Sequence, residues 1–282
     1  MKRTISKAKE QDICDLAEAV AEEYTTESSD KANLELIAEQ NDITYSYGHY
    51  GESFDGMLEH KSSRFHIYCN LDRLKKSNSP RSRFTFAHEL GHYYIDDHRN
   101  ALESGKVPAH PSICEYQSKN IVEQEADLFA SNLLMPASRF SSLVDSTPIG
   151  AESIFKAANQ FKVSLSSAAV RYCKSDIVPC TIIKWSQRGY DWKLISLSTY
   201  KATLRKTIEK IGDIPRDSPT FRILNEERPK EGFFEAGTTV AHWFPYIDHS
   251  SQKKSILIEQ AISLGSYGAI TILFPESGQY SS

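Results

Sequence analysis

The pentapeptide His88-Glu89-Leu90-Gly91-His92 combines residue types that can hold and use a divalent metal ion. Residues four positions apart lie on one face of an α-helix, so both imidazoles can bind the same ion, which we expect to be zinc. The carboxylate between them then lies beside the water that the ion activates. We therefore predict His88 and His92 as metal ligands and Glu89 as the catalytic general base.

Apolar residues around the motif indicate the element that positions it. Phe84, Ala87, Tyr94 and Ile95 recur at helical spacing on either side of the histidines, which predicts an amphipathic helix of about three turns. The alternative interpretation is a surface helix with two incidental histidines. We disfavour it because unpaired imidazoles are costly to bury among apolar side chains.

Length and composition limit the possible functions. The chain has 282 residues, 40% of them hydrophobic, which is enough for two domains with well-formed cores. A net charge of −4 argues against a general nucleic-acid or membrane-surface role, since both favour a basic excess. The N-terminal residues lack the apolar run of a secretory signal, no segment reaches transmembrane length, and the five cysteines form no C-x-x-C pair. We therefore expect a cytoplasmic protein with reduced thiols.

The periodicity predicts an α+β fold in three parts. A zincin-like metallopeptidase domain spans 1–147, a helical segment spans 148–175, and a smaller α+β module spans 176–282. In the first part a small antiparallel sheet precedes the motif helix, which is the usual zincin order, and residues 98–121 form a loop. The predicted helices are 9–24, 31–40, 121–134, two within 151–174, 200–211 and 255–263, and the predicted strands are 43–50, 56–59, 64–69, 180–186, 192–198, 238–244 and 269–274.

A catalytic zinc site needs a third protein ligand. His98 follows His92 by six residues, the metzincin spacing, but Ile95 occupies the position where that fold needs a glycine to reverse the chain. Glu123 and Glu125, on the helix predicted at 121–134, are the alternatives. Only one of these two carboxylates can point inward.

Helical geometry favours Glu123 over Glu125. Glu123 shares a face with Asp127, four residues later, while Glu125 lies about 200° around the helix, where we expect it to face solvent. The first pair matches an E-x-x-x-D arrangement in which the glutamate binds the metal and the aspartate orients a ligand imidazole. We predict Glu123 as the third ligand and Asp127 as the partner of a ligand histidine.

Two blocks of the sequence resemble the ImmA/IrrE metallopeptidases. They are Arg83-Phe84-Thr85-Phe86-Ala87-His88-Glu89-Leu90-Gly91-His92 and Glu123-Gln124-Glu125-Ala126-Asp127-Leu128-Phe129-Ala130, the second followed by Leu133-Leu134-Met135-Pro136. The resemblance implies a gluzincin-like peptidase with Glu123 as the third ligand and Glu89 as the catalytic carboxylate. It also implies a substrate, a helix-turn-helix transcriptional repressor whose cleavage triggers a stress or mobile-element response. Longer members of the family have a similar layout, which implies a sensory or regulatory role for the module at 176–282.

The residues leave several alternatives open. Manganese or iron can replace zinc at an N/O site, and the oxyanion donor can come from Tyr93, Tyr94, His98 or a loop residue near His110. A protein that binds and sequesters a repressor without cutting it would need the same core. A peptidase with another protein target would also share it.

Two further segments have alternative interpretations. Residues 151–174 superficially resemble a DNA-binding helix-turn-helix, but Arg171 and Lys174 are the only basic residues of the second helix, so direct nucleic-acid binding is disfavoured. His242 and Trp243 can line a pocket, although a buried aromatic cluster with Phe244 and Tyr246 is the preferred interpretation.

Overall fold

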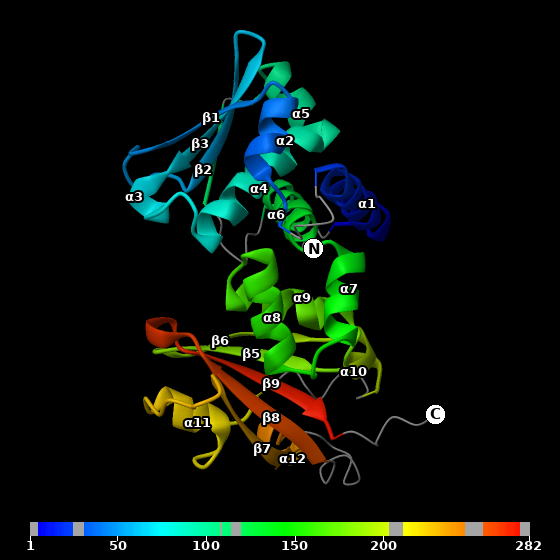
Figure 1. The fold of residues 1–282 in the computed structure, drawn as a ribbon, viewed down its shortest axis with the longest axis vertical. Helices are drawn as coiled ribbons and strands as arrows, with labels where there is room; N and C mark the ends of the chain where they lie inside the picture. The colour runs from blue at the N-terminus through cyan, green and yellow to red at the C-terminus, as the bar shows by residue number, and fades with distance from the viewer. Residues whose placement is uncertain are drawn as a thin grey trace. The chain divides into compact units, whose positions relative to one another are not determined.

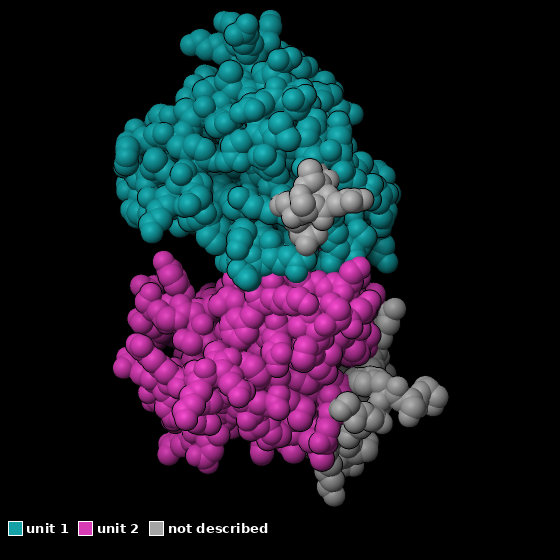
Figure 2. Space-filling view, in the orientation of Figure 1, with its two compact units in different colours: residues 1–140, 159–164 teal, residues 141–158, 165–282 magenta. Residues whose placement is uncertain are grey.

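The computed structural model describes residues 5–24, 31–107, 109–113, 120–202, 211–245 and 256–276. The chain forms two compact units (Figure 2), unit 1 with residues 1–140 and 159–164 and unit 2 with residues 141–158 and 165–282. Helices and strands occur in both units, so the predicted α+β class is confirmed. The three-part division at residues 147 and 175 stays a prediction.

Unit 1 combines a four-stranded sheet with helices (Figure 1). Its elements are α1 (Lys7–Tyr24), α2 (Leu34–Gln40), β1 (Thr44–Gly48), β2 (Gly56–Lys61), β3 (Arg64–Asn70), α3 (Leu71–Leu74), α4 (Pro80–Tyr94), α5 (Asp96–Glu103), β4 (His110–Ser112) and α6 (Ile121–Leu134). Two further helices, α7 (Ala137–Asp145) and α8 (Ala151–Phe161), pass from one unit into the other. The segment predicted as a loop at 98–121 thus contains most of α5 and the short strand β4.

The sheet of unit 1 has the order β1-β3-β2-β4 and is mixed rather than wholly antiparallel. β2 pairs antiparallel with β3 and with β4, but β1 pairs parallel with β3. Ser62 and Ser63, both with positive φ, form the tight turn that joins β2 to β3, and β1 pairs with the other edge of β3, running opposite to β2 and therefore parallel to β3. The expected order of sheet followed by motif helix is nevertheless present.

Helix α4 is the central element of unit 1. It packs against α6 on one side and against β2 and β3 on the other, while α1 packs against α6. Phe86 and Leu90 of α4 and Phe129 of α6 are fully buried at these contacts. Burial of large apolar side chains on both sides of α4 stabilises the helix that carries the predicted motif.

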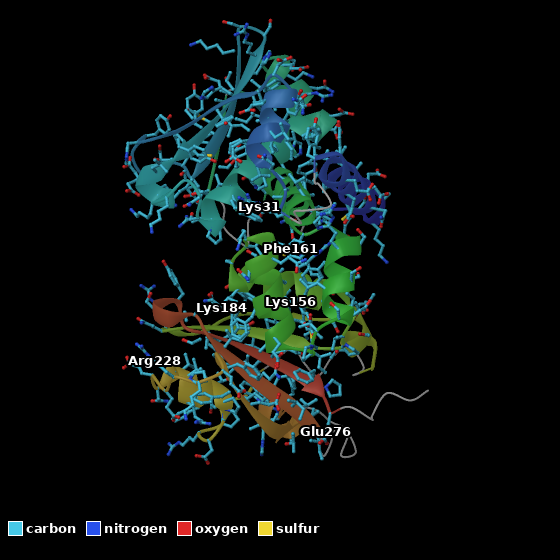
Figure 3. The ribbon with its side chains drawn as sticks, in the orientation of Figure 1. Lys31, Lys156, Phe161, Lys184, Arg228 and Glu276 are labelled. Atoms are coloured by element: carbon cyan, nitrogen blue, oxygen red, sulfur yellow. The ribbon has the colours of Figure 1, made fainter. Side chains whose placement is uncertain are left out.

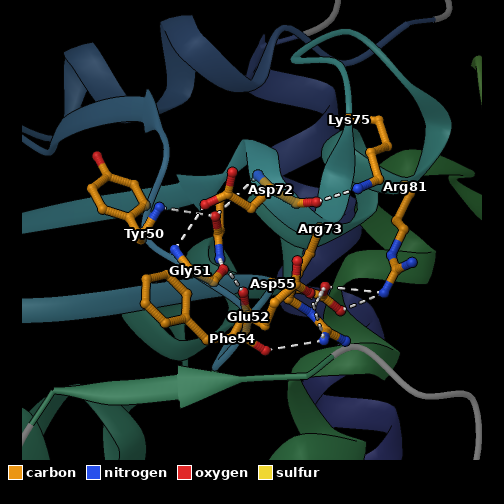
Figure 4. A network of polar contacts seen from close by, with 10 residues as sticks. Tyr50, Gly51, Glu52, Phe54, Asp55, Asp72, Arg73, Lys75 and Arg81 are labelled. Atoms are coloured by element: carbon orange, nitrogen blue, oxygen red, sulfur yellow. Dashed lines mark hydrogen bonds and ion pairs between the residues drawn. The ribbon is translucent and has the colours of Figure 1, made fainter.

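A buried carboxylate fastens the start of β2 to α3 and to the first turn of α4 (Figure 4). Asp55 is completely buried and accepts hydrogen bonds from Arg73 Nε at 2.8 Å and from Arg81 Nη2 at 2.9 and 3.0 Å. Its backbone N–H donates to the carbonyl of Ser112 in β4, and its carbonyl accepts from Asn70 in β3. The network therefore holds the start of α4 in a fixed position relative to β2, β3 and β4.

Unit 2 is built on a five-stranded antiparallel sheet with the order β6-β5-β9-β8-β7. Its elements are α9 (Leu165–Ser175), β5 (Thr181–Ser186), β6 (Gly189–Ile195), α10 (Leu197–Ala202), α11 (Pro219–Leu224), β7 (Phe233–Thr239), α12 (Val240–Trp243), β8 (Ile256–Ser263), the 3₁₀ turn η1 (Gly265–Tyr267) and β9 (Ala269–Pro275). Helix α9 packs on β5 and β6, and α11 packs on β7, β8 and β9 from the opposite face (Figure 1). Lys184 of β5 (Figure 3) donates to Asp191 and to the carbonyl of Tyr267 and so ties three segments at one end of the sheet.

Two predicted elements of the C-terminal part are wrong. Residues 255–263, expected as a helix, contain strand β8, and residues 238–244, expected as a strand, contain the end of β7 followed by α12. The helix expected at 200–211 corresponds only to the end of α10, and residues 203–210 lie outside the described residues. The hairpin and the last strand are confirmed as β5, β6 and β9.

The core of unit 2 contains a buried acid. Glu259 of β8 accepts hydrogen bonds from the backbone N–H and hydroxyl of Thr220 at 2.9 Å and from Trp243 Nε1 at 3.1 Å. Burial raises the pKa of Glu259 although these hydrogen bonds oppose the shift. Trp243 is fully buried and packs against Trp185, so the aromatic-cluster interpretation is supported for Trp243 and Phe244, and Tyr246 lies outside the described residues.

The described cysteines form no disulfide, and Cys114 lies outside the described residues. No helix in the described ranges is both long enough and apolar enough to cross a membrane.

Candidate metal centre

Helix α4 presents the two motif histidines on one face. Ser79 caps its N-terminus by accepting the N–H of Ser82, and Pro80 stands at the first helical position, where its missing N–H costs nothing. The four-residue spacing then brings the Nε2 atoms of His88 and His92 to 3.2 Å of each other. Both side chains are buried, with 1% relative exposure.

Helix α6 supplies the carboxylate. The side chain of Asn120 caps the helix by accepting the N–H of Val122. In the first turn, Glu123 places Oε2 3.4 Å from His88 Nε2 and Oε1 3.5 Å from His92 Nε2. The structure thus brings the three predicted ligands together, from two helices that are far apart in the sequence.

A glycine inside the motif permits this approach of α6 to α4. A Cβ atom at Gly91 would lie 3.2 Å from both Cα and O of Ala126 and 3.3 Å from Cβ of Phe129. Carbon atoms in ordinary contact are about 3.5–4.0 Å apart, so any side chain at position 91 would press on the backbone of α6. Gly91 and the small Ala126 therefore form the crossing point that sets how close Glu123 comes to the histidines.

The donor set and its spacing fit a zinc-type ion. Two imidazoles and one carboxylate are the protein ligands of His₂Glu catalytic zinc sites, which keep a fourth position open. Tetrahedral coordination at about 2.0–2.1 Å places ligand atoms about 3.3 Å apart, close to the separations of 3.2, 3.4 and 3.5 Å found here. Among the described residues, His88, His92 and Glu123 offer ligand atoms that all lie within 4.8 Å of one another.

The surroundings of the two histidines shift their pKa values in opposite directions. Burial lowers the pKa of His92 to about 3, in spite of the nearby Glu123. Burial also opposes charge on His88, but hydrogen bonds to Asp127 and Glu123 outweigh it and raise the pKa of His88 to about 10. The carboxylates beside His88 therefore favour a positive charge at this position, which is what a divalent ion would supply.

Asp127 lies beside His88 as the sequence predicted. Its Oδ1 atom is 2.8 Å from Nδ1 of His88, on the side of the ring away from Glu123. A carboxylate at Nδ1 holds the proton there and leaves Nε2 free to bind a metal. The contact follows from the spacing of four residues between Glu123 and Asp127 on α6.

Glu89 lies between α4 and the sheet. Its side chain is completely buried, and a Cβ atom at Gly56 of β2 would fall 2.7 Å from Glu89 Oε1. Only glycine at position 56 leaves the Glu89 carboxylate its place against the strand. The carboxylate is also near enough to His88 to favour the charged form of that ring, which agrees with a location beside the ligand cluster.

The two alternative third ligands, His98 and Glu125, form a pair of their own. His98 lies in α5 with Nδ1 3.2 Å from Nδ1 of His92, and its Nε2 is 3.0 Å from Glu125 Oε2. Both residues are buried, so the expectation that Glu125 faces solvent was wrong. The reason is that α5 follows α4 directly and brings His98 to the Glu125 side chain, while α1 packs against α6. Sequence reasoning missed this pair because helix spacing does not predict where α5 turns.

The remaining candidates fall outside the ligand cluster. Tyr94 donates no hydrogen bond toward it: its hydroxyl accepts from Asn41 at 2.8 Å, and its ring stacks on Phe129. Tyr93 packs edge-on against Phe65. The side chain of His110 lies outside the described part of the chain. On α9, Ala168, Ala169, Val170, Tyr172 and Cys173 are buried, which fits a scaffold helix better than a DNA reader.

Comparisons with known proteins agree with this geometry. Residues 74–172 match the model of the peptidase M78 family, described as an IrrE N-terminal-like domain. The matched segment contains α4, α5 and α6, so the predicted resemblance to the ImmA/IrrE metallopeptidases is confirmed and the core of unit 1 is zincin-like. The match supports a metallopeptidase in general.

A solved structure has a similar fold. A "Mycobacterium tuberculosis transcriptional regulator" is 12% identical in sequence, with a TM-score of 0.60 over 94% of this chain and 76% of that one. The match therefore includes residues of both units, and the similarity concerns the fold. A search of curated proteins found no match.

Proposed function

We propose that this chain, which carries an IrrE N-terminal-like peptidase domain, is a metal-dependent endopeptidase that cleaves a helix-turn-helix transcriptional repressor in a stress or mobile-element response. The observation that carries the proposal is the convergence of His88, His92 and Glu123 at separations that suit one ion. The buried carboxylate of Glu89, one residue from the first ligand, supplies the base that peptide hydrolysis needs.

In this proposal His88, His92 and Glu123 hold the ion, and Asp127 keeps the Nδ1 proton of His88 in place. When bound, such an ion polarises a scissile carbonyl and lowers the pKa of water. Glu89 takes a proton from the attacking water and passes it to the leaving amine. Zinc is the first choice on donor type, with manganese or iron as alternatives.

The test uses Glu89→Gln and His88→Ala, with Glu103→Gln on the exposed side of α5 as the matched control. Each purified full-length protein is incubated with candidate repressors, in the first place those encoded beside its gene, and fragments are assigned by mass spectrometry. Glu89→Gln should retain the metal and lose about 10²- to 10⁴-fold in cleavage rate, whereas His88→Ala should lose the metal too. Equal cleavage by wild type and Glu89→Gln would refute the catalytic assignment.

The alternative is a regulatory protein that sequesters a repressor without cutting it. Unit 1 would then bind a repressor in a fixed ratio, and removing the metal with a chelator would not relieve that binding. Intact repressor after incubation, together with complex formation by Glu89→Gln and His88→Ala, would favour this alternative. Cleavage of a different protein would retain the peptidase and replace the substrate.

We further propose that the C-terminal part is a regulatory module. Unit 2 contains a cavity of about 740 Å³ bordered by Trp185, Tyr190 and Phe221, with Asp213 and Asn225 as polar groups. Aromatic walls with a few polar groups suit a small, partly apolar molecule. A molecule that raises the melting temperature of the wild type but not of Tyr190→Ala, and that changes cleavage, would support this role.

A further inference from the structure

The two ligand histidines are held from outside the metal site in different ways. His88 Nδ1 meets a carboxylate directly, Asp127 at 2.8 Å. His92 Nδ1 meets another imidazole, His98 at 3.2 Å, and the carboxylate of Glu125 lies beyond it, 3.0 Å from His98 Nε2. In both cases the Nε2 atom faces the ligand cluster and the Nδ1 atom faces away from it.

The direction of the hydrogen bonds follows from the donors and acceptors available. An ionised carboxylate only accepts, so the nitrogen of His98 that faces Glu125 must carry a proton. A neutral imidazole has one N–H and one lone pair, so Nδ1 of His98 then accepts a hydrogen bond. The proton of that bond belongs to Nδ1 of His92. Nε2 of His92 is left with a lone pair directed at the ligand cluster.

The burial of the pair makes this direction the consistent one. His98 and Glu125 are 7% and 9% exposed, and taking a ring out of water disfavours its doubly protonated, charged form. A doubly protonated His98 would donate from both nitrogens. His92 would then accept at Nδ1 and carry its proton on Nε2, where it would block metal binding.

We propose that His98 and Glu125 are positioning residues that hold His92 in the tautomer whose Nε2 binds the metal ion, the role that Asp127 has for His88. The inference rests on the metal site of the proposed function. It adds a second carboxylate, Glu125, which acts on the ligand His92 through His98, beside Asp127, which acts on His88 directly. It also gives His98 a role other than that of a third ligand. The connection runs through three helices, because His92, His98 and Glu125 lie on α4, α5 and α6.

The first test needs no metal and no variant. Full-length protein labelled with ¹⁵N-histidine is prepared metal-free, and long-range proton–nitrogen correlations assign the protonated nitrogen of each ring. His92 should carry its proton on Nδ1 and His98 on Nε2. A His92 protonated on Nε2 in the wild type would overturn the proposal, whether or not the protein proves to bind metal.

The second test separates positioning from space filling. His98→Phe keeps a ring of similar shape but removes both nitrogens, and Glu125→Gln keeps a carbonyl oxygen that can accept from His98. The control is Asn132→Ser, which removes a buried side chain on α6 that donates to the carbonyl of Leu128. Zinc dissociation constants are measured by competition with a chelator, and melting temperatures are recorded beside them.

His98→Phe should weaken zinc binding about 10- to 100-fold, the usual effect of losing a partner of a ligand histidine, and should spread His92 over both tautomers. The separate variant Glu125→Gln should retain most of the wild-type zinc affinity, because its amide oxygen can still accept the hydrogen bond from His98. Asn132→Ser should lower the melting temperature and leave the His92 tautomer unchanged. A folded His98→Phe that binds zinc like the wild type would overturn the proposal, whereas a wild type that binds no zinc would overturn the proposed function instead.

Discussion

Replacing Gly91 by alanine tests whether the crossing of α4 and α6 sets the geometry of the metal site. Glycine in the middle of a helix costs about 1 kcal/mol relative to alanine, so on helix propensity alone Gly91→Ala should stabilise the protein. The structure predicts otherwise. The new methyl group would lie 3.2 Å from the backbone of Ala126, closer than ordinary contact by about 0.3 Å or more.

The magnitude follows from two opposing terms. Forcing a methyl group into a packed interface costs about 1–3 kcal/mol, because the obstacle here is helix backbone rather than a flexible side chain. Subtracting the gain in helix propensity of about 1 kcal/mol leaves a net loss of about 0–2 kcal/mol. The larger effect should be on the metal, since an outward shift of α6 moves Glu123 but leaves His88 and His92 in place. Ligand distances must be kept within about 0.2 Å, so we expect at least a tenfold loss of zinc affinity.

Urea denaturation and chelator competition on the same preparations measure the two effects. Gly237→Ala is the control, because a Cβ atom there meets nothing within 4 Å and the variant should stay within about 0.5 kcal/mol of the wild type. If Gly91→Ala is more stable by about 1 kcal/mol and binds zinc with unchanged affinity, the close crossing does not constrain the site. The close approach of α6 would then not be the reason why position 91 is a glycine.

Two other buried carboxylates have testable consequences. Burial raises the pKa of Glu259, so folded protein keeps a proton there that the unfolded chain releases above the usual glutamate pKa of about 4.3. The free energy of unfolding should therefore fall as pH rises above about 4.3, and Glu259→Gln should make this fall smaller. The same pH dependence of the free energy of unfolding in both proteins, measured by urea denaturation, would contradict this. Asp55→Asn should lower the free energy of unfolding by about 3 kcal/mol, the low end of the range for a broken buried pair, because Arg81 can turn to solvent. A thermal melt equal to that of the wild type would show that Asp55 does not fasten α4.

The residues that could hold a metal ion could be predicted because the information that brings them together is local. His88, His92 and Glu89 lie within five residues, and Glu123 with Asp127 repeats the same spacing on a second helix. Helix geometry turns such spacings into shared faces without any knowledge of the rest of the fold. The structure adds how the two faces meet, at the small residues Gly91 and Ala126.

The error at residues 256–263 shows where local pattern fails. The segment Ile256-Leu257-Ile258-Glu259-Gln260-Ala261-Ile262-Ser263 is a short apolar run interrupted by two polar residues, which periodicity cannot assign to helix or strand. It forms β8, and both polar side chains are buried with distant partners. Glu259 accepts from Thr220, and Gln260 accepts from the N–H of Ala151. A buried polar residue in a strand is stable only because such partners exist, and they are 39 and 109 residues away.

The pairing of His98 with Glu125 also depends on a partner from another helix, 27 residues away in the sequence. The β-branched Ile95 stands where a metzincin turn needs a glycine, and in the structure this residue leaves the helix with extended backbone, φ −77° and ψ 110°, and immediately precedes α5. His98 therefore lies in the first turn of a new helix, on the Nδ1 side of His92 rather than on the ligand side. The break between α4 and α5 at Ile95 thus places His98 beside Nδ1 of His92, where we propose that it orients the ring. Ile95 and His98 can both be identified in the sequence, but the contact between His98 and His92 depends on the direction of α5, which the sequence pattern does not give.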